Sequence, residues 1–189
     1  MAPSKVASNP VDGASRHGYR PRVTLRMFDG PRGEYTLRFA TLEDAPILAH
    51  HRAAMFHDMG DVDEQAASII ENASIDHLTA LMEAREYFGF LVEFEGEVVA
   101  GGGAWLRHLL PRPGSLHASL EAYVLNVYVE PEHRRGGVAR ALMETIVDWS
   151  RDQKVARVVL HASKEGRPLY EELGFELSNE YRLKLTDAR

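Results

Sequence analysis

The chain has 189 residues, enough for one domain whose core buries about 70% of the surface of the unfolded chain. Its hydrophobic fraction of 44%, its net charge of −6 and its lack of cysteine are typical of a soluble globular protein and exclude disulfides, thiolate zinc sites and a cysteine nucleophile. The charge disfavours nucleic acid as a partner, and no run approaches the ~20 apolar residues that span a membrane. The N-terminus lacks the apolar core of a signal peptide, so we expect a cytoplasmic protein.

The N-terminal stretch differs in charge from the rest of the chain. Residues 1–33 hold six Lys or Arg against two Asp or Glu, a net charge of +4 that leaves −10 for residues 34–189. Residues 1–21 are rich in Pro, Gly and Ser and have almost no apolar periodicity, which predicts a flexible segment. This start is compatible with a transit peptide or with a bacterial extension. We expect an extension over 1–33, in which 23–33 could add a strand and a turn, followed by one domain at 34–189.

Alternating and helical apolar patterns predict the elements of the first half of the domain. Thr41 is a suitable N-cap for the first helix and Gly60 ends it, while a break is expected near Ser74 in the second helical region. In chain order these elements are a strand at 34–40, helices at 42–59 and 61–86, and strands at 87–95 and 97–110.

The second half contains the strongest local signals. A loop at 111–119 is expected to be mobile, because it holds two prolines and a glycine. An apolar, β-branched run at 123–129 predicts a buried strand, which precedes a helix that begins near Val138. The remaining predicted elements are a strand at 157–162, a short helix at 167–173 and a closing strand at 175–185.

The turn between the buried strand and its helix has the features of a phosphate-binding site. Gly136 and Gly137 have no Cβ, so that a ligand can approach the backbone closely. The free N–H groups and the dipole of the following helix favour an anion by about 0.3–1 kcal/mol. Positive charge is added by Arg134, Arg135 and Arg140. The glycine spacing fits neither the dinucleotide fingerprint nor the P-loop.

Two motifs resemble those of the GCN5-related N-acetyltransferase (GNAT) superfamily. The stretch Arg134-Arg135-Gly136-Gly137-Val138-Ala139 is similar to the motif that binds the pyrophosphate of acetyl-CoA in that superfamily. Residues 160–175 resemble its closing element, in which a tyrosine, here Tyr170, stands four residues before a Gly-Phe pair. Ser163 and Gly166 depart from the commonest residues at their positions but keep them small. The predicted order β-α-α-β-β-β-α-β-α-β over about 35–185 also matches the superfamily.

The resemblance implies an α/β (α+β) fold with a mixed, mostly antiparallel central sheet flanked by helices. It implies acetyl-CoA as co-substrate and Tyr170 as the acid for the departing thiolate. It further implies that the central strand binds the pantetheine through its backbone at a bulge. The residues implied in binding acetyl-CoA are Val127, Tyr128, Val129, Arg134, Arg135, Gly136, Gly137, Val138, Ala139, Arg140, Ser163 and Tyr170.

The general base is less well defined by the sequence. Histone-type members of the superfamily use a carboxylate at the position of Tyr123, and here that carboxylate is absent. Glu121 lies on the same strand face by alternation and is our candidate, with Glu93 or a water relay as alternatives. The spacing of the nine histidines provides no tight ligand pair, so no metal is expected.

The function expected from this resemblance is acetyl transfer from acetyl-CoA to a primary amine of a small molecule by direct attack. The predicted strand at 97–110 contains Gly101-Gly102-Gly103, which we interpret as room for a substrate or for the acetyl group. The acidic domain would attract a cationic acceptor. Two alternatives stay open, a non-catalytic sensor of acyl-CoA and an acyltransferase for peptide or protein amines. A homodimer is compatible with the sequence.

Overall fold

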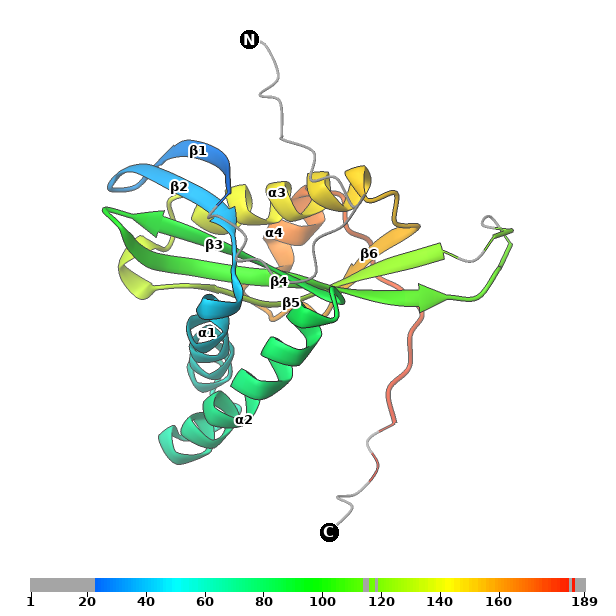
Figure 1. Ribbon diagram of the computed structural model, residues 1–189, viewed down its shortest axis with the longest axis horizontal. Coiled ribbons are helices and arrows are strands. Elements are labelled where there is room, and N and C mark those ends of the chain that lie inside the picture. Colours follow the sequence, from blue (N-terminus) through cyan, green and yellow to red (C-terminus); the bar gives the residue numbers. More distant parts are fainter. Residues whose placement is uncertain (1–22, 114–115, 118, 184, 186–189) are drawn as a thin grey trace.

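The computed structural model describes residues 23–113, 116–117, 119–183 and 185 (Figure 1). The predicted flexibility of residues 1–21 and part of the predicted mobile loop at 111–119 therefore lie outside the described residues. Within the described part, no helix combines the length and the apolar character that crossing a membrane requires.

One six-stranded sheet forms the centre of the molecule, with its strands in chain order from one edge to the other. Neighbours from the first strand to the fifth are antiparallel, and only the fifth and sixth are parallel, as the mixed, mostly antiparallel prediction requires. The added strand expected near residues 23–28 is present at one edge. The strands are β1 Thr24–Gly30, β2 Gly33–Phe39, β3 Tyr87–Phe94, β4 Glu97–Leu109, β5 Ser119–Val129 and β6 Arg157–Leu160.

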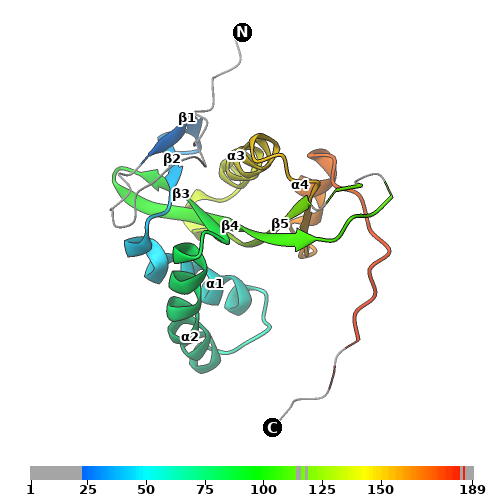
Figure 2. The same cartoon turned by 45° about the vertical axis from the view of Figure 1, so that its right-hand side comes forward.

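Two pairs of helices cover the two faces of this sheet (Figures 1 and 2). The helices α1 (Ala45–Asp58) and α2 (Glu64–Glu83) lie on one face, and α3 (Val138–Asp152) and α4 (Arg167–Glu172) lie on the other. Asp63 caps α2 by accepting a hydrogen bond from the Ala66 N–H at 2.8 Å. The predicted break near Ser74 is wrong, because α2 runs unbroken and packs along α1.

The core has two parts, one on each face of the sheet. The larger part lies between the strands and α3, whose strongly amphipathic sequence buries Leu142, Ile146 and Trp149 against Phe90. The smaller part lies under α1 and α2 and contains Leu48, Leu78, Tyr87 and Leu91.

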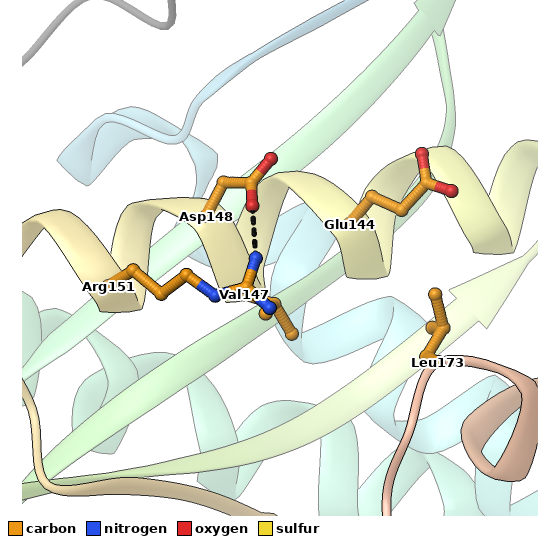
Figure 3. Close-up of a pocket in the computed structure, with 5 residues that line it drawn as sticks. All are labelled: Glu144, Val147, Asp148, Arg151 and Leu173. Atoms are coloured by element: carbon orange, nitrogen blue, oxygen red, sulfur yellow. Dashed lines mark hydrogen bonds and ion pairs between the residues drawn. The ribbon is translucent and has the colours of Figure 1, made fainter.

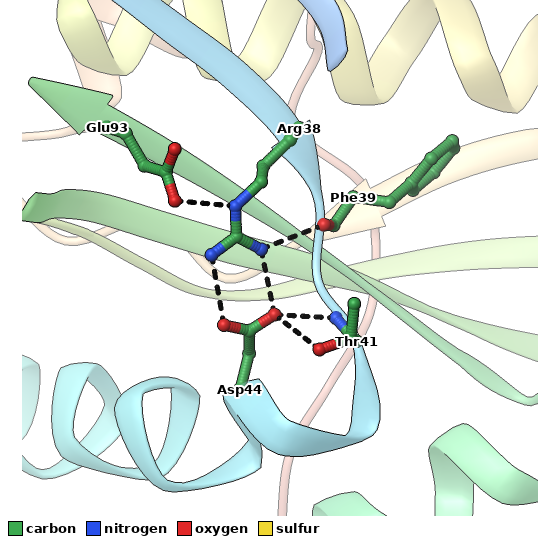
Figure 4. A network of polar contacts seen from close by, with 5 residues as sticks. All are labelled: Arg38, Phe39, Thr41, Asp44 and Glu93. Carbon is green, nitrogen blue, oxygen red and sulfur yellow. Dashed lines mark hydrogen bonds and ion pairs between the residues drawn. The ribbon is translucent and has the colours of Figure 1, made fainter. Parts of the chain in front are cut away.

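The junction between β2 and α1 is a buried ion-pair network (Figure 4). Asp44 lies in a 3₁₀ turn (Leu42–Asp44) and binds the guanidinium of Arg38 through both carboxylate oxygens, at 2.8 and 3.0 Å. The same carboxylate accepts from the backbone N–H of Thr41, and Glu93 accepts from Arg38 Nε at 2.7 Å. The Arg38 guanidinium holds the pKa of Asp44 below its usual value even though burial opposes this. The network fixes the direction in which α1 leaves the sheet.

The three glycines of β4 make room for protein side chains. The prediction that they leave space for a substrate or for the acetyl group is therefore wrong. A Cβ on Gly101 would lie 2.6 Å from Nδ1 of His51, and one on Gly103 would lie 2.2 Å from the Tyr87 ring. Gly102 faces the opposite side, where Val127 packs at 3.2 Å. The glycines thus bring His51 and Tyr87 against the strand at the centre of the sheet.

The closing strand predicted at 175–185 is absent from the described residues of that segment. Leu177, Tyr181 and Leu183 are exposed by 82–97%. The segment is held near β6 by polar contacts from Arg182 to His161. The strand β6 is only four residues long, so its free edge can form few hydrogen bonds with another strand. These few bonds do not offset the entropy cost of ordering the longer segment 175–185.

Candidate functional site

The centre of β5 contains a β-bulge. Asn126 has a φ of 60°, a left-handed conformation that Asn tolerates better than most residues. The register against β4 shifts here, because Gly103 pairs with Leu125 while Gly101 pairs with Tyr128. Two residues of β5, Asn126 and Val127, therefore lie opposite one residue of β4. The only sequence signal for this bulge is an Asn within a β-branched, aromatic run.

Beyond the bulge, β5 loses its neighbour on the β6 side. The parallel pairing extends from Glu121–Arg157 to Val124–Leu160 and stops there. Within the described residues, no strand pairs with positions 125–129 on that side. An extended ligand can therefore bind backbone groups of β5 as an added strand would.

The turn after β5 leads into α3 and leaves the first N–H groups of this helix open. Arg135 and Gly137 both have left-handed backbone conformations, with φ of 62° and 84°. The first hydrogen bond of the helix is from the Ala141 N–H to the Gly137 carbonyl, at 2.9 Å. The N–H groups of residues 138–140 thus have no partner within the helix. A Cβ on Gly137 would meet nothing within 4 Å, so this side of the turn is open.

The first glycine of the motif, Gly136, makes room for a neighbouring hairpin, a role that was not predicted. A Cβ on Gly136 would lie 2.3 Å from the Pro31 ring, in the turn between β1 and β2. Close to that contact, the Tyr35 hydroxyl and Nδ1 of His133 form a buried hydrogen bond of 2.7 Å. The β1–β2 hairpin therefore braces the turn, an arrangement for which the sequence carries no local signal.

The three arginines of the motif differ in their contacts. Arg134 binds Asp58 of α1 at 2.5 Å and the Val129 carbonyl at 2.7 Å, so it ties α1 to the end of β5. Arg140 pairs with Glu172 of α4. Arg135 makes no ion pair with the described residues, so its charge is available to a ligand.

Tyr170 lies on α4 and lines a cavity of about 660 Å³. Other residues around this cavity come from β5, β6 and the C-terminal segment and include Tyr123, Leu160 and His161. Burial raises the pKa of Tyr170, so its hydroxyl stays protonated at neutral pH and can donate a hydrogen bond. Ser163 lies at the start of the same helix, where its Oγ accepts from the Gly166 N–H at 3.0 Å.

The two carboxylates considered as bases are both held by arginines. Glu121 is 3% exposed and binds the guanidinium groups of Arg107 and Arg157, one on each carboxylate oxygen. It lies at the far end of the β5–β6 pairing from the bulge. Glu93 belongs to the Arg38 network. The two guanidinium groups occupy both oxygens of the Glu121 carboxylate, so neither oxygen is free to accept a proton from an acceptor amine.

A polar cluster on the α1–α2 face of the sheet meets the bulge from the other side. Nη1 of Arg52 donates to Oδ1 of Asn126 at 2.6 Å, and the Arg52 guanidinium stacks on Phe56 at 4.9 Å. Burial raises the pKa of Tyr87, whose hydroxyl lies near Asn126, to about 12. The sequence analysis missed this cluster, because it depends on how α1, β3 and β5 come together in the fold.

Other features near α3 provide no site. A small hollow of about 140 Å³ on its outer face is lined by side chains such as Asp148 and Arg151, which form an ion pair one turn apart (Figure 3). Among the described residues, no group of His, Asp and Glu side chains is arranged to hold a metal ion.

Comparisons with known proteins agree with this geometry. The model of the acetyltransferase (GNAT) family matches residues 50–175. The chain is 29% identical over 143 residues to an uncharacterized N-acetyltransferase of Escherichia coli, YjgM, across 74% of this chain and 81% of the relative. It is 24% identical to thialysine N-epsilon-acetyltransferase of Caenorhabditis elegans, across 72% and 82% of the two chains.

Solved structures have the same fold. A GCN5-related N-acetyltransferase from Ralstonia eutropha superposes with a TM-score of 0.74 at 29% identity, over 81% of this chain and 99% of that one. A predicted acetyltransferase from Clostridium acetobutylicum, crystallised with acetyl-CoA, superposes with a TM-score of 0.70 at 22% identity. That comparison covers 80% of this chain and 96% of the other.

Proposed function

The chain belongs to the acetyltransferase (GNAT) family, and from this premise we propose that it is an N-acetyltransferase that moves the acetyl group of acetyl-CoA directly to a primary amine. One observation carries the proposal. The bulge at Asn126, the unpaired edge of β5 beyond it and the open start of α3 follow one another along 12 residues of chain, 126–137. Together they form a continuous backbone surface for a long ligand that ends in an anion.

The donor substrate fits this surface in a defined direction. The pyrophosphate of acetyl-CoA would accept hydrogen bonds from the N–H groups of residues 138–140, with Arg135 supplying charge. Its pantetheine would lie along the free edge of Val127–Val129. The thioester would then lie near the bulge.

Transfer requires a new bond from the acceptor nitrogen to the carbonyl carbon and cleavage of the C–S bond. Tyr170 is our proposed acid for the departing sulfur. A tyrosine pKa near 10 lies above a thiol pKa near 8.5, so full proton transfer would be uphill by about 2 kcal/mol. Burial of Tyr170 raises its pKa further. Its main contribution is therefore a hydrogen bond that strengthens as charge develops on sulfur.

The acceptor amine must lose a proton before or during its attack. For an amine with a pKa of about 10.4 this costs roughly 4.6 kcal/mol at pH 7. Because the Glu121 carboxylate is engaged by two guanidinium groups, we assign the proton to a water relay instead.

A small molecule is our proposed acceptor rather than a protein tail. The net charge of −10 on residues 34–189 favours the approach of the ammonium group of an amine. A peptide amine remains the second candidate, because the exposed C-terminal segment and the Tyr170 cavity adjoin each other.

Calorimetry with acetyl-CoA tests the donor site. We expect Gly137→Glu to abolish binding, because a carboxylate would occupy the open side of the turn. Gly96→Glu is the matched control, since Gly96 also has a positive φ and open space around it but lies in the β3–β4 turn. Unchanged affinity in Gly137→Glu would show that acetyl-CoA binds elsewhere.

A thiol-release assay tests turnover. Polyamines, amino acids, aminoglycosides and peptides are offered with acetyl-CoA, and we expect release with a small amine. Release with peptides alone would replace the small-molecule acceptor by a peptide. Binding of acetyl-CoA without release from any amine would favour the sensor alternative.

A further inference from the structure

A guanidinium group lies beside the bulge on the face of the sheet that α1 and α2 cover. Arg52 extends from α1 and is bound at its Nη1 to Oδ1 of Asn126, the residue that forms the bulge. Asn126 is 2% exposed and its left-handed backbone is fixed within the sheet. The position of the Arg52 guanidinium is therefore set by the same residue that shapes the proposed thioester site.

Arg52 differs from the structural arginines in its partners. Arg38 and Arg134 each bind a carboxylate, and so does Arg157. Arg52, which is partly buried, forms no ion pair with the described residues, and its contacts are the Asn126 carboxamide and the Phe56 ring. A partly desolvated cation without a counter-ion gains strongly from an anionic ligand, because the local dielectric constant is low.

Further polar atoms beside Arg52 lack hydrogen bonds. The Tyr87 hydroxyl lies near the Asn126 side chain, yet neither this hydroxyl nor Nδ2 of Asn126 has a partner in good geometry. Tyr87 is 2% exposed, and its ring occupies the space that Gly103 leaves free. Buried polar groups in native proteins are almost always paired, so this cluster is suited to a polar ligand that completes it.

Resting on the proposed function, we propose that Arg52 binds an oxyanion of the acceptor, so that the acceptor is an amine that also carries a carboxylate or phosphate group. The Arg52 guanidinium contacts the side chain of the bulge residue Asn126, and the thioester is proposed to lie at the same bulge. An anion bound by Arg52 is therefore separated by only a few atoms from the amine that attacks the thioester. Guanidinium groups bind both kinds of oxyanion through two parallel hydrogen bonds. The net negative charge of the domain then favours the ammonium end, while Arg52 selects the anionic end.

Matched pairs of acceptors test this assignment. Amino acids are compared with their amides and short aminoalkyl phosphates with the corresponding amino alcohols, by thiol release from acetyl-CoA. We expect one anionic series to exceed its neutral partner in kcat/KM by at least tenfold, and the better series identifies the oxyanion. Arg52→Met is expected to remove that preference through KM, and Arg52→Lys to restore it in part.

Two controls separate this inference from the proposed function. Arg85→Met removes an exposed guanidinium at the α2–β3 junction and is expected to change nothing. Acetyl-CoA affinity is expected to be the same in Arg52→Met as in the natural chain. Should no amine turn over, the same pairs are titrated by calorimetry into the CoA complex, and Arg52-dependent binding of the anionic member supports the inference although transfer fails.

The inference is overturned by either of two results. One is that the anionic and neutral members of both series have equal kcat/KM, or equal affinity where calorimetry replaces the activity assay. The other is an equal loss for both members in Arg52→Met, which would make Arg52 a residue that only supports the bulge.

Discussion

His51 is a single residue whose burial should be visible in the stability of the whole chain. It is 0% exposed between Gly101 and the Tyr128 ring, and neither ring nitrogen has a hydrogen bond. Burial, with a smaller contribution from His50, lowers its pKa from 6.5 to about 4. Glu130, 3.9 Å away, is too distant to offset this loss of hydration.

The pH dependence of stability follows from this pKa. Between pH 6.5 and about 4 the unfolded chain binds a proton at His51 that the folded chain does not. The free energy of unfolding should therefore fall as the pH is lowered through this window, by up to about 3 kcal/mol from this residue. Denaturant unfolding at pH 7 and pH 5 measures the slope. His51→Met should have a shallower slope, and an equal slope in both proteins would contradict the burial of a neutral imidazole.

Tyr170 gives a second prediction at the scale of one residue. Tyr170→Phe keeps the ring that packs edge-on against Phe175 at 5.9 Å and removes only the hydroxyl. We expect kcat to fall at least tenfold, because general acid catalysis typically contributes about 10²–10⁴-fold, while acetyl-CoA affinity and Tm hold. Tyr181→Phe, at a position exposed by 97%, is the control. An unchanged kcat would restrict Tyr170 to packing.

At the scale of elements, the β1–β2 hairpin contacts the turn that is proposed to bind phosphate. Tyr35→Phe would leave its ring between Phe28 and Phe94 but remove the partner of the buried His133 nitrogen. An unpaired buried acceptor or donor costs about 1–3 kcal/mol. We expect a loss of stability in this range and acetyl-CoA binding weakened several-fold, measured by denaturation and calorimetry.

A surface contact of the same hairpin is the control for that variant. The ion pair between Arg26 and Glu144 is more than a third exposed on both sides, and such pairs contribute about 0–1 kcal/mol. Arg26→Met should thus have little effect on stability or on acetyl-CoA binding. If Tyr35→Phe lowers stability but not acetyl-CoA affinity, the hairpin supports the sheet without bracing the turn.

Local patterns predicted most elements and the turn before α3, because apolar periodicity and the Arg-Gly signature are contained in short stretches. The bulge, the roles of Gly101 and Gly136, and the meeting of Arg52 with Asn126 depend on register between segments far apart in the chain. A pattern within one short stretch of sequence does not determine how that stretch is aligned with a distant strand. The overpredicted strand at 175–185 has the opposite cause, since alternation is local but a strand also requires a partner edge.

At the scale of the whole molecule, some arginines stabilise the fold through ion pairs, whereas others are available to ligands. The domain is acidic overall, yet several of its arginines are paired with carboxylates at structural junctions, as in the networks of Arg38, Arg134 and Glu121. Arg52 and Arg135, which make no ion pair with the described residues, lie at the two ends of the proposed reaction surface. These two arginines can therefore bind negatively charged groups of a ligand, although the net charge of the domain is negative.

The extent of the folded domain is a further property of the whole molecule, and two truncations test it. Removal of residues 1–22 deletes a stretch with few apolar residues, so we expect Tm and acetyl-CoA affinity to hold. Removal of residues 1–33 also deletes β1, with Leu25 buried in the main core and Pro31 against Gly136.

The longer truncation should be clearly destabilised. Burial of one leucine side chain contributes about 1.5–3 kcal/mol, and the lost β1–β2 ladder adds to this. Because 1 kcal/mol corresponds to roughly 2–4 °C for a chain of this size, we expect Tm to fall by about 5–10 °C. Acetyl-CoA affinity should fall with it, since Pro31 no longer supports the turn. Calorimetry and thermal scans of both truncations decide the matter. An equal fall in both would show that residues 1–22 pack on the domain, and no fall in either would show that β1 is dispensable to the sheet.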